Sequence, residues 1–172
     1  ALVQDQNHTP NTLLINWPNK PFVCVGLHQI IDNSIEKEYI KSQNLPVVRR
    51  GCGGGSVFLD SNQVFYQIIC KKEEYNFDLS TFYEYFLSPV VETYQYFNVP
   101  AEYSPINDIV AQEKKISGNG AVTYGNSRIL VGNFIFKIGK ATGIPGLIFG
   151  FIGIALLVIY SVAKKKEITP KD

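Results

Sequence analysis

Short apolar runs separated by turn-forming residues extend from Leu13 to Ile69, and such runs are typical of β-strands. Prolines at positions 18 and 21 indicate a turn between the first two runs. The last two runs flank Asp60–Gln63, which predicts a pair of strands joined at that turn. The predicted strands are Leu13–Trp17, Phe22–Gly26, Leu45–Arg50, Ser56–Leu59 and Val64–Ile69.

A helix is predicted over Ile31–Gln43, where the apolar spacing changes from that of a strand to that of a helix. The polar residues at positions 32 to 34 offer side chains that cap a helix start. Ile35, Tyr39 and Ile40 would then face the core. This segment is therefore expected to pack as one amphipathic helix.

A longer, aromatic helix is predicted from Asp78 or Ser80 through Tyr96. Its apolar residues recur at helical spacing and form one stripe, which is far more often a core face than a cofactor site. The stripe consists of Phe82, Phe86, Val90, Tyr94 and Phe97.

The segment before residue 137 ends in a predicted hairpin. Val122–Tyr124 and Ile129–Val131 flank the turn residues Gly125–Arg128, and Phe134–Phe136 continues the second strand. Together with the earlier elements, this pattern predicts an α+β fold with a largely antiparallel sheet and packed helices. That domain is expected to occupy residues 1–139.

The far end has a different composition, with no charged residue from Gly143 to Ala163. A stretch of about 20 apolar residues is long enough to cross the hydrocarbon core of a bilayer as a helix. Lys140, Tyr160 and the lysines at 164 to 166 supply the basic and aromatic flanks of a membrane interface. The sequence therefore predicts a transmembrane helix at 143–163 and a short basic tail at 164–172.

Three glycines follow one face of this predicted membrane helix. Gly146, Gly150 and Gly153 recur at spacings that let helix backbones approach closely in lipid. Packing against another membrane subunit is one interpretation. The other is that glycine is common in membrane helices without such a role.

Charge and cysteine content limit the function classes. The 172 residues carry 16 Lys+Arg against 15 Asp+Glu, so no basic surface for nucleic acid is expected. The three cysteines form no Cys-x-x-Cys pair and have no histidine at ligand spacing. Neither a disulfide framework nor a zinc site is supported.

Candidate chemistry lies first in the glycine-rich segment that follows Arg49 and Arg50. Gly53, Gly54 and Gly55 can expose several backbone N–H groups in one concavity, and arginine pairs with phosphate or carboxylate oxygens. The segment therefore favours an anion site. The alternative is a glycine loop that serves only as a tight turn.

A second cluster combines Asn107 and Asp108 with Lys115, which precedes Ile-Ser-Gly-Asn-Gly. A lysine here can bring a cation to a bound phosphate, and Asn107 and Asp108 can orient a nucleotide or hold Mg²⁺. Taken alone, the lysine segment also fits a solvated turn between two strands.

Several ordered motifs carry a family resemblance. Arg-Arg-x-x-Gly-Gly-Gly-x-Val-Phe-x-Asp is followed by Asn-Asp-Ile and then by Lys-Ile-Ser-Gly-Asn. Over about Leu13 to Phe136 the chain resembles the lipoate-protein ligase family, which is related to biotin ligases and octanoyl transferases. The resemblance implies a lipoate/biotin ligase-like fold. Family members continue beyond the strand that ends at Phe136, so residues 1–139 are expected to form an incomplete domain.

The resemblance also implies an activity: ATP-dependent activation of lipoate or octanoate to an acyl-adenylate, with Mg²⁺, and transfer to a lysine of a carrier such as an E2 subunit or H protein. Lys115 matches the family's lysine because it directly precedes Ile-Ser-Gly. Arg50 and the three glycines would contact the acyl-adenylate. Asn107 and Asp108 match the Asn-Asp pair, which implies a phosphate role and, for Asp108, a metal role.

Two function classes follow for the whole chain. The first is a membrane-anchored ligase whose soluble domain lies on the cytoplasmic side. The second is an inactive ligase-like accessory subunit of a membrane complex, held by membrane lipid and by the glycine face of its helix.

Overall fold

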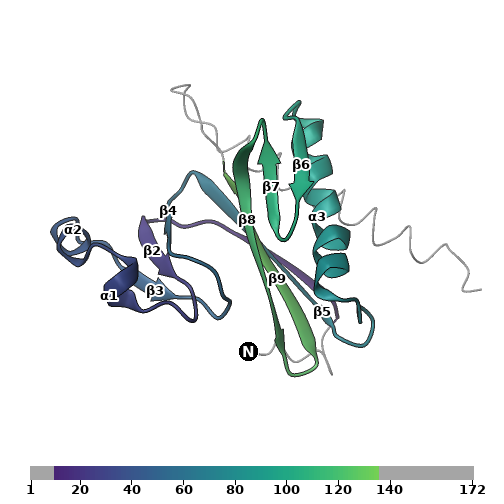
Figure 1. Ribbon diagram of the computed structural model, residues 1–172, viewed down its shortest axis with the longest axis horizontal. Coiled ribbons are helices and arrows are strands. Elements are labelled where there is room, and N and C mark those ends of the chain that lie inside the picture. Colours follow the sequence, from purple (N-terminus) through teal and green to yellow (C-terminus); the bar gives the residue numbers. More distant parts are fainter. Residues whose placement is uncertain (1–9, 136–172) are drawn as a thin grey trace, which may run out of the picture. The chain divides into compact units, whose positions relative to one another are not determined.

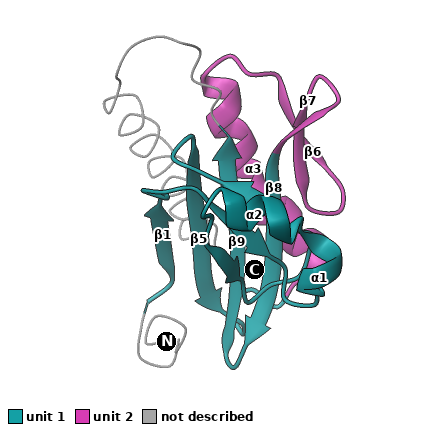
Figure 2. Ribbon diagram, turned by 90° about the vertical axis from the view of Figure 1, so that its left-hand side faces the viewer, with its two compact units in different colours: residues 1–76, 117–137 teal, residues 77–116, 138–172 magenta. Residues whose placement is uncertain are grey.

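The computed structural model describes residues 10–135 (Figure 1). These residues form two compact units, which Figure 2 shows in different colours. Unit 1 contains the described residues up to Asn76 and those from Ser117 to Ile135, and unit 2 contains Phe77–Ile116. No helix in this described part is long and apolar enough to cross a membrane. The predicted membrane helix at 143–163, its glycines Gly146, Gly150 and Gly153, and the basic tail lie outside the described residues.

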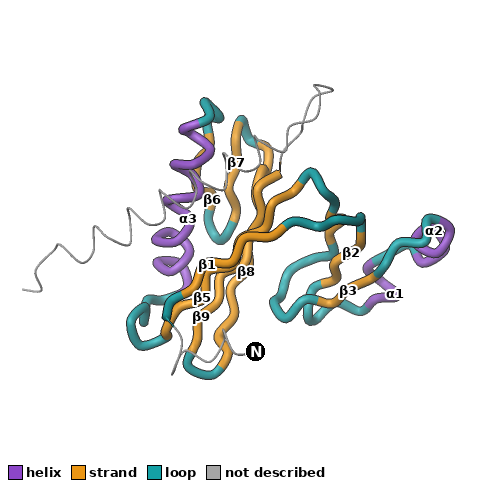
Figure 3. The backbone as a smooth tube through the Cα atoms, turned by 180° about the vertical axis from the view of Figure 1, so that it is seen from behind, coloured by secondary structure: helices purple, strands orange, loops and turns teal. Residues whose placement is uncertain are grey.

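Unit 1 contains a large antiparallel sheet, as the sequence predicts. Its strands lie in the order β1-β5-β9-β8, and their long pairing is visible in Figure 3. A two-residue turn with Gly125 at φ 56° joins β8 to β9, which confirms the predicted hairpin. The bounds are β1 Thr12–Asn16, β5 Gln63–Lys71, β8 Lys114–Tyr124 and β9 Ser127–Ile135.

A smaller sheet in unit 1 has the order β3-β2-β4 and comprises β2 Phe22–Val25, β3 Val47–Arg49 and β4 Val57–Leu59. Strand β2 pairs with β3 in parallel and with β4 in antiparallel orientation. The predicted pairing of Ser56–Leu59 with Val64–Ile69 is therefore wrong. The turn after β4 does form, because the Asn62 N–H donates to Asp60 Oδ1 at 2.9 Å, but a turn does not choose the partner. Strand β5 pairs along its whole length with β9 instead.

The predicted helix over Ile31–Gln43 is also wrong as one element. Two short helices form instead, α1 Ile31–Ser34 and α2 Lys37–Ser42, and Ile35 between them is extended. The Ser34 hydroxyl donates to the Ile30 carbonyl at 2.7 Å, the kind of local bond with which serine competes against helix continuation. Neither helix buries a residue, and Tyr39 is 62% exposed, so this segment does not face the core.

Unit 2 contains the long helix α3, Leu79–Tyr96, and the hairpin of β6 Ala101–Ser104 with β7 Asp108–Ala111. Asp78 caps the helix, as predicted, by accepting from the Thr81 N–H at 3.0 Å. Phe82, Val90 and Tyr94 of the predicted stripe are buried, whereas Phe86 and Phe97 are partly exposed. The stripe is therefore a core face.

The three cysteines Cys24, Cys52 and Cys70 are buried free thiols. Burial raises the pKa of Cys70 to about 12, with Arg128 opposing the shift and Glu74 adding to it. A thiol in this state is almost entirely protonated at neutral pH, so Cys70 is not a nucleophile.

The Asp78 cap predicts a pH dependence of stability. Hydrogen bonds from the Thr81 side chain and backbone lower the pKa of the Asp78 carboxyl. A carboxyl with a lowered pKa stabilises the fold above its unfolded-state pKa of ~4, and this contribution is lost as the pH falls through the folded value. Asp78→Asn keeps an acceptor for the helix start but does not titrate. We expect urea unfolding of this variant to show a weaker pH dependence below about pH 4 than the wild type. Parallel curves would contradict this role.

Candidate anion site

The predicted site residues fall into both units. Arg50 and the three loop glycines lie in unit 1, between β3 and β4. Asn107, Asp108 and Lys115 lie in unit 2, around β7 and the start of β8. Each group has a geometry of its own.

Arg49 binds the backbone that follows β2. Its Nη1 donates to the carbonyls of Gly26, Leu27 and Gln29 at 2.8, 3.0 and 2.8 Å. A guanidinium carries several donors in a fixed plane, which suits it to collecting carbonyls from one turn. Arg49 therefore fixes the segment against which the glycine loop packs.

Arg50 binds the glycine loop itself. Its Nη2 donates to the Gly53 carbonyl at 2.8 Å and to the Gly55 carbonyl at 2.7 Å, and its Nε donates to Gly53 at 3.2 Å. Its Nη1 is directed toward the carbonyl and Sγ of Cys24, at 3.5 and 3.8 Å. The donors of Arg50 are thus directed at backbone carbonyls of its own unit.

Two glycines allow the loop to close onto β2. A Cβ added to Gly26 would lie 1.9 Å from the Gly54 carbonyl oxygen, so the two backbones touch where a side chain would stand. Gly54 itself has φ +97°, a conformation that residues with side chains rarely adopt. Close approach at one position and positive φ at the other explain why both are glycine.

Cys52 connects the loop to the large sheet. Its side chain is 5% exposed, and a Cβ at Gly120 of β8 would lie 3.2 Å from its sulfur. Leu27 N–H donates to the Cys52 carbonyl at 3.0 Å and holds the same residue from the side of β2. Cys52 is therefore a packing residue between the loop and β8, the role expected of a small buried thiol.

The Ser-Gly-Asn motif after Lys115 lies in a strand, so its interpretation as a solvated turn is wrong. Ser117 is fully buried, and the side chain of Asn119 accepts a hydrogen bond from the Tyr66 hydroxyl of β5. A Cβ on Gly132 would lie 2.1 Å from Asn119 Oδ1 and 2.3 Å from the Tyr66 oxygen. The glycine in β9 thus leaves the space in which this pair forms.

A second amide reinforces that strand. Asn133 Oδ1 accepts from the Gly118 N–H at 2.9 Å, and Asn133 Nδ2 donates to Gln63 Oε1 at 2.9 Å. Side chains of β5 and β9 therefore fix the backbone of the Ser-Gly-Asn motif. Buried polar groups that are paired in this way favour one strand arrangement over others.

In unit 2, Lys115 forms an ion pair with Asp108. Lys115 Nζ lies 2.6 Å from Asp108 Oδ1, an atom that is fully covered, while the two side chains are 53% and 33% exposed. Gln112 and Glu113 form the turn from β7 to β8, with φ 50° and 62°. Positive φ at both positions is the geometry of a tight two-residue hairpin turn, which returns β8 beside β7. The turn therefore brings the lysine to the aspartate.

Asn107 occupies the turn between β6 and β7. The Tyr103 hydroxyl donates to the Ile106 carbonyl at 2.6 Å and holds this turn. Burial is the main cause that raises the pKa of Tyr103, and Glu84 adds to the shift, so the phenol remains a donor. The sequence-adjacent Asn107 and Asp108 offer amide and carboxylate oxygens, the ligands that Mg²⁺ prefers. Within residues 10–135, no group of three acidic, histidine or cysteine side chains forms a metal site.

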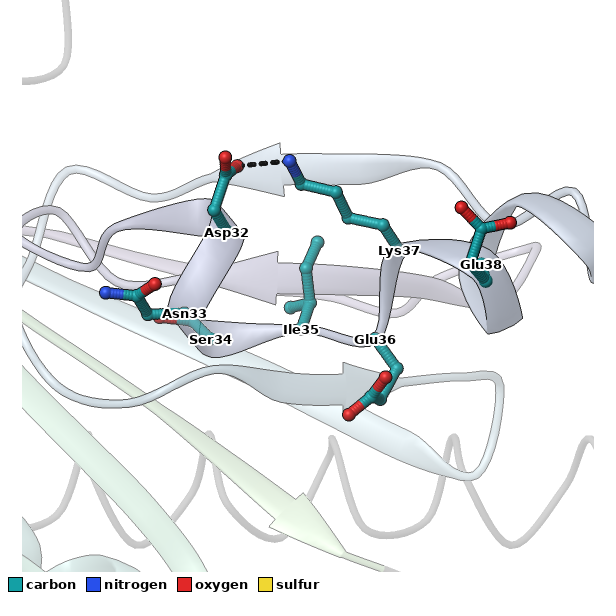
Figure 4. Close-up of a pocket in the computed structure, with 7 residues that line it drawn as sticks. All are labelled: Asp32, Asn33, Ser34, Ile35, Glu36, Lys37 and Glu38. Atoms are coloured by element: carbon teal, nitrogen blue, oxygen red, sulfur yellow. Dashed lines mark ion pairs between the residues drawn. The ribbon is translucent and has the colours of Figure 1, made fainter.

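A surface depression between α1 and α2 holds a different set of side chains (Figure 4). An exposed ion pair joins Lys37 to Asp32 at 2.5 Å. Exposed ion pairs of this kind contribute little stability. No described residue of the predicted site lines the depression. The lining residues are Asp32, Asn33, Ser34, Ile35, Glu36, Lys37 and Glu38.

Sequence reasoning missed the residues that pack against the glycine loop and the Ser-Gly-Asn motif. Gly26 is the last residue of a predicted strand, and Gly132 lies inside one. An isolated glycine at such positions signals a close backbone approach. Those two signals were available in the sequence. Tyr66 and Asn119 gave no such signal, because only the pairing of β5, β8 and β9 brings them together.

The described residues form an α+β domain with a large antiparallel sheet, and comparison with known proteins places it in a family. The Lipoyl protein ligase A/B catalytic domain family matches residues 1–137, so the chain belongs to that family.

Two curated relatives have similar identity to the chain. Lipoate--protein ligase 1 of Staphylococcus aureus is 33% identical over 108 residues, which are 63% of this chain and 32% of the relative. Lipoate-protein ligase LplJ of Bacillus subtilis is 33% identical over 106 residues, or 62% of this chain and 31% of the relative. The chain therefore spans about a third of the length of these relatives.

Solved structures share the fold at low sequence identity. Plasmodium falciparum LipL1 in complex with lipoate has a TM-score of 0.74 and 19% identity, covering 99% of this chain and 56% of LipL1. A lipoate-protein ligase A bound with ATP has a TM-score of 0.71 and 17% identity, and the match covers 92% of this chain and 79% of that ligase. A bi-partite lipoate protein ligase of Thermoplasma acidophilum was studied with its E2 lipoyl domain. It has a TM-score of 0.68 and 17% identity, and the match covers 92% of this chain and 66% of that ligase chain. These similarities confirm a lipoate ligase-like α+β fold with a large antiparallel sheet.

The contact between Gly26 and Gly54 predicts a selective effect of added methyl groups. Gly26→Ala places its Cβ against a backbone carbonyl that has no flexible end to move away. Such overpacking destabilises a fold by about 1–3 kcal/mol. We expect urea unfolding to show a loss of that size.

Gly51→Ala is the matched control, because a Cβ at Gly51 meets nothing within 4 Å. Its free energy of unfolding should stay within about 0.5 kcal/mol of the wild type. Equal losses for the two variants would show that the Gly26 contact is not the cause.

Proposed function

We propose that this chain activates lipoate or octanoate with ATP to an acyl-adenylate and transfers the acyl group to a lysine of a carrier protein. The observation that carries the proposal is the Lys115–Asp108 pair, which presents a half-exposed ammonium group in the Lys-Ile-Ser-Gly-Asn segment of a ligase-family domain. The family match, the fold and the retained motifs all support this function.

The chemistry requires positioning more than it requires a reactive side chain. The carboxylate of the acid attacks the α-phosphorus of ATP. The bond from the α-phosphorus to the oxygen that bridges it to the β-phosphorus breaks, and pyrophosphate leaves. The amine of the carrier lysine then attacks the acyl carbonyl, and AMP leaves. Lys115 would hold the carboxyl and α-phosphate oxygens and neutralise the charge that develops on them. No side-chain nucleophile is needed, which agrees with a protonated Cys70.

ATP and lipoate are the proposed ligands because solved relatives of the same fold were determined with each of them. Mg²⁺ fits the oxygen donors of Asn107 and Asp108, which would hold the ion and, when bound, let it offset phosphate charge. Asp108 Oδ1 is engaged by Lys115 at 2.6 Å, so the proposed metal contact concerns the other carboxylate oxygen.

The proposed partner is a lipoyl carrier domain of an E2 subunit or an H protein. The T. acidophilum structure concerns a ligase together with its E2 lipoyl domain, which supports a partner of this kind. The relatives named above are ligases, so the alternative of an inactive accessory subunit of a membrane complex draws no support from them.

Lys115→Ala tests the activity. We expect the full chain, with ATP, Mg²⁺ and lipoate, to release pyrophosphate. Removing one positioned cation should lower kcat about 100- to 1,000-fold, the range seen when a charge-stabilising donor is removed.

Lys114→Ala is the control, because it removes the same charge from the neighbouring residue, which is exposed at the start of β8. It should retain most of the wild-type rate. No pyrophosphate release from folded wild-type protein would reject the proposed function, and equal losses in the two variants would reject the role of Lys115.

We also propose that residues 143–163 anchor the chain in a membrane and leave residues 1–139 on the cytoplasmic side, where ATP is available. The uncharged stretch and its lysine flanks support this proposal. The full chain should stay in the membrane pellet after alkaline carbonate extraction. Leu156→Arg with Leu157→Arg should release it, because each buried charge opposes insertion by about 2.5–3.5 kcal/mol. Release of the wild type would reject the anchor.

A further inference from the structure

Arg50 faces backbone carbonyls, and this arrangement assigns it a role different from the ligand contact that the family resemblance implies. Its Nη2 and Nε donate to the carbonyls of Gly53 and Gly55 at 2.7 to 3.2 Å, and its Nη1 is directed toward Cys24. A guanidinium has five N–H donors. The Nε, Nη1 and Nη2 atoms of Arg50 are therefore all directed at groups of its own unit.

The direction of the two carbonyls fixes the direction of two amides. The peptide bonds from Gly53 to Gly54 and from Gly55 to Ser56 are trans. In a trans peptide unit the C=O and the N–H point in opposite directions. Since Arg50 draws the carbonyls of Gly53 and Gly55 toward itself, the N–H groups of Gly54 and Ser56 point away from it.

The loop has open space at two of its glycines and has unpaired donors. A Cβ added at Gly53 or Gly55 would meet nothing within 4 Å. Within the described part of the chain, the N–H groups of Gly54 and Ser56 have no hydrogen-bond partner, and the Ser56 hydroxyl oxygen is covered and unpaired. The covered Ser56 oxygen calls for a ligand or water. Backbone N–H groups that point to the same side of a glycine loop suit an anion.

We propose that Arg50 is a positioning residue, and that the N–H groups of Gly54 and Ser56 bind the phosphoryl oxygens of the acyl-adenylate. The proposal rests on the proposed function and refines it: the anion is bound by backbone, and the arginine orients that backbone. The positive charge behind the loop also strengthens the two amides as donors to an anion.

Gly54 provides a way to disturb this arrangement without removing the arginine. A Cβ at Gly54 would lie 2.8 Å from Arg50 Nη2, and φ +97° strains any other residue there. Gly54→Ala therefore displaces the guanidinium from the carbonyls while its charge remains. Arg50→Lys keeps the charge as well, but it concentrates three donors on one nitrogen and cannot reproduce the fork.

The test measures the unliganded loop and the ligand affinity separately. The full chain is labelled with ¹⁵N-glycine and ¹⁵N-serine. Before any ligand is added, Arg50→Lys should shift the amide resonances of residues 54 to 56, and Gly54→Ala should shift those of residues 55 and 56. The same variants should bind a non-hydrolysable acyl-sulfamate analogue of lipoyl-adenylate at least about tenfold more weakly, the effect of losing a hydrogen bond to a charged group.

Two controls separate this role from general effects. Lys20→Gln removes an exposed positive charge elsewhere in unit 1, and Gly51→Ala adds a methyl group at an open position of the same loop. Both should leave the resonances of residues 54 to 56 and the affinity unchanged. Dispersed resonances from Ser127 and Gly132 of β9 show that each variant is folded.

The results distinguish the two levels of the proposal. Wild-type affinity in Arg50→Lys, or unchanged amide resonances in its unliganded form, would overturn the positioning role. Loss of affinity without a change in the unliganded loop would instead assign Arg50 a direct ligand contact. If the wild type does not bind the analogue, the proposed function fails, and the unliganded resonances still decide whether Arg50 sets the direction of the amides.

Discussion

The approach of Gly54 to Gly26 is the constraint on which the arrangement of the glycine loop depends. The carbonyl oxygen of Gly54 occupies space that a side chain on Gly26 would take, so the loop can lie against β2 only if position 26 has no Cβ. Once the loop is there, the guanidinium of Arg50 reaches two of its carbonyls. The absence of a side chain at the end of β2 thus permits the hydrogen bonds that order the loop between β3 and β4.

In unit 2 the charged side chains Lys115 and Asp108 are held by an ion pair with each other. The ammonium group of Lys115 is neutralised by Asp108 in the absence of substrate, and a partly exposed pair of this kind is stabilised only modestly. An incoming anion can therefore compete for the lysine at small cost. The pair keeps the lysine close to its proposed place of action without committing it to a strong internal contact.

Local sequence patterns predicted the elements that local forces determine. The capped and striped helix α3 and the turn between β8 and β9 follow from residues close together in the chain. The pairing of β4 with β2 and the break at Ile35 did not follow, because partner choice and the absence of a core face depend on distant residues. A single sequence does not contain that information in readable form.

The site shows the same division. Motif spacing identified Arg50, Asp108 and Lys115, and the structure pairs the last two. The sequence implied that Arg50 contacts a ligand, since an arginine beside glycines favours an anion, whereas its observed partners are carbonyls of the loop. The direction of the Arg50 donors could not be read from the sequence, because residue types define which donors exist but not where they point.

The contact at Gly26 has a consequence for judging diverged copies of this domain. Gly26 stands more than 20 positions before Arg50 and outside the arginine and glycine motif. A copy that replaced Gly26 by a larger residue would keep every letter of the motif and lose the closed loop. An intact motif is therefore weak proof of a working site, and the residue to inspect first is the glycine that the motif does not contain.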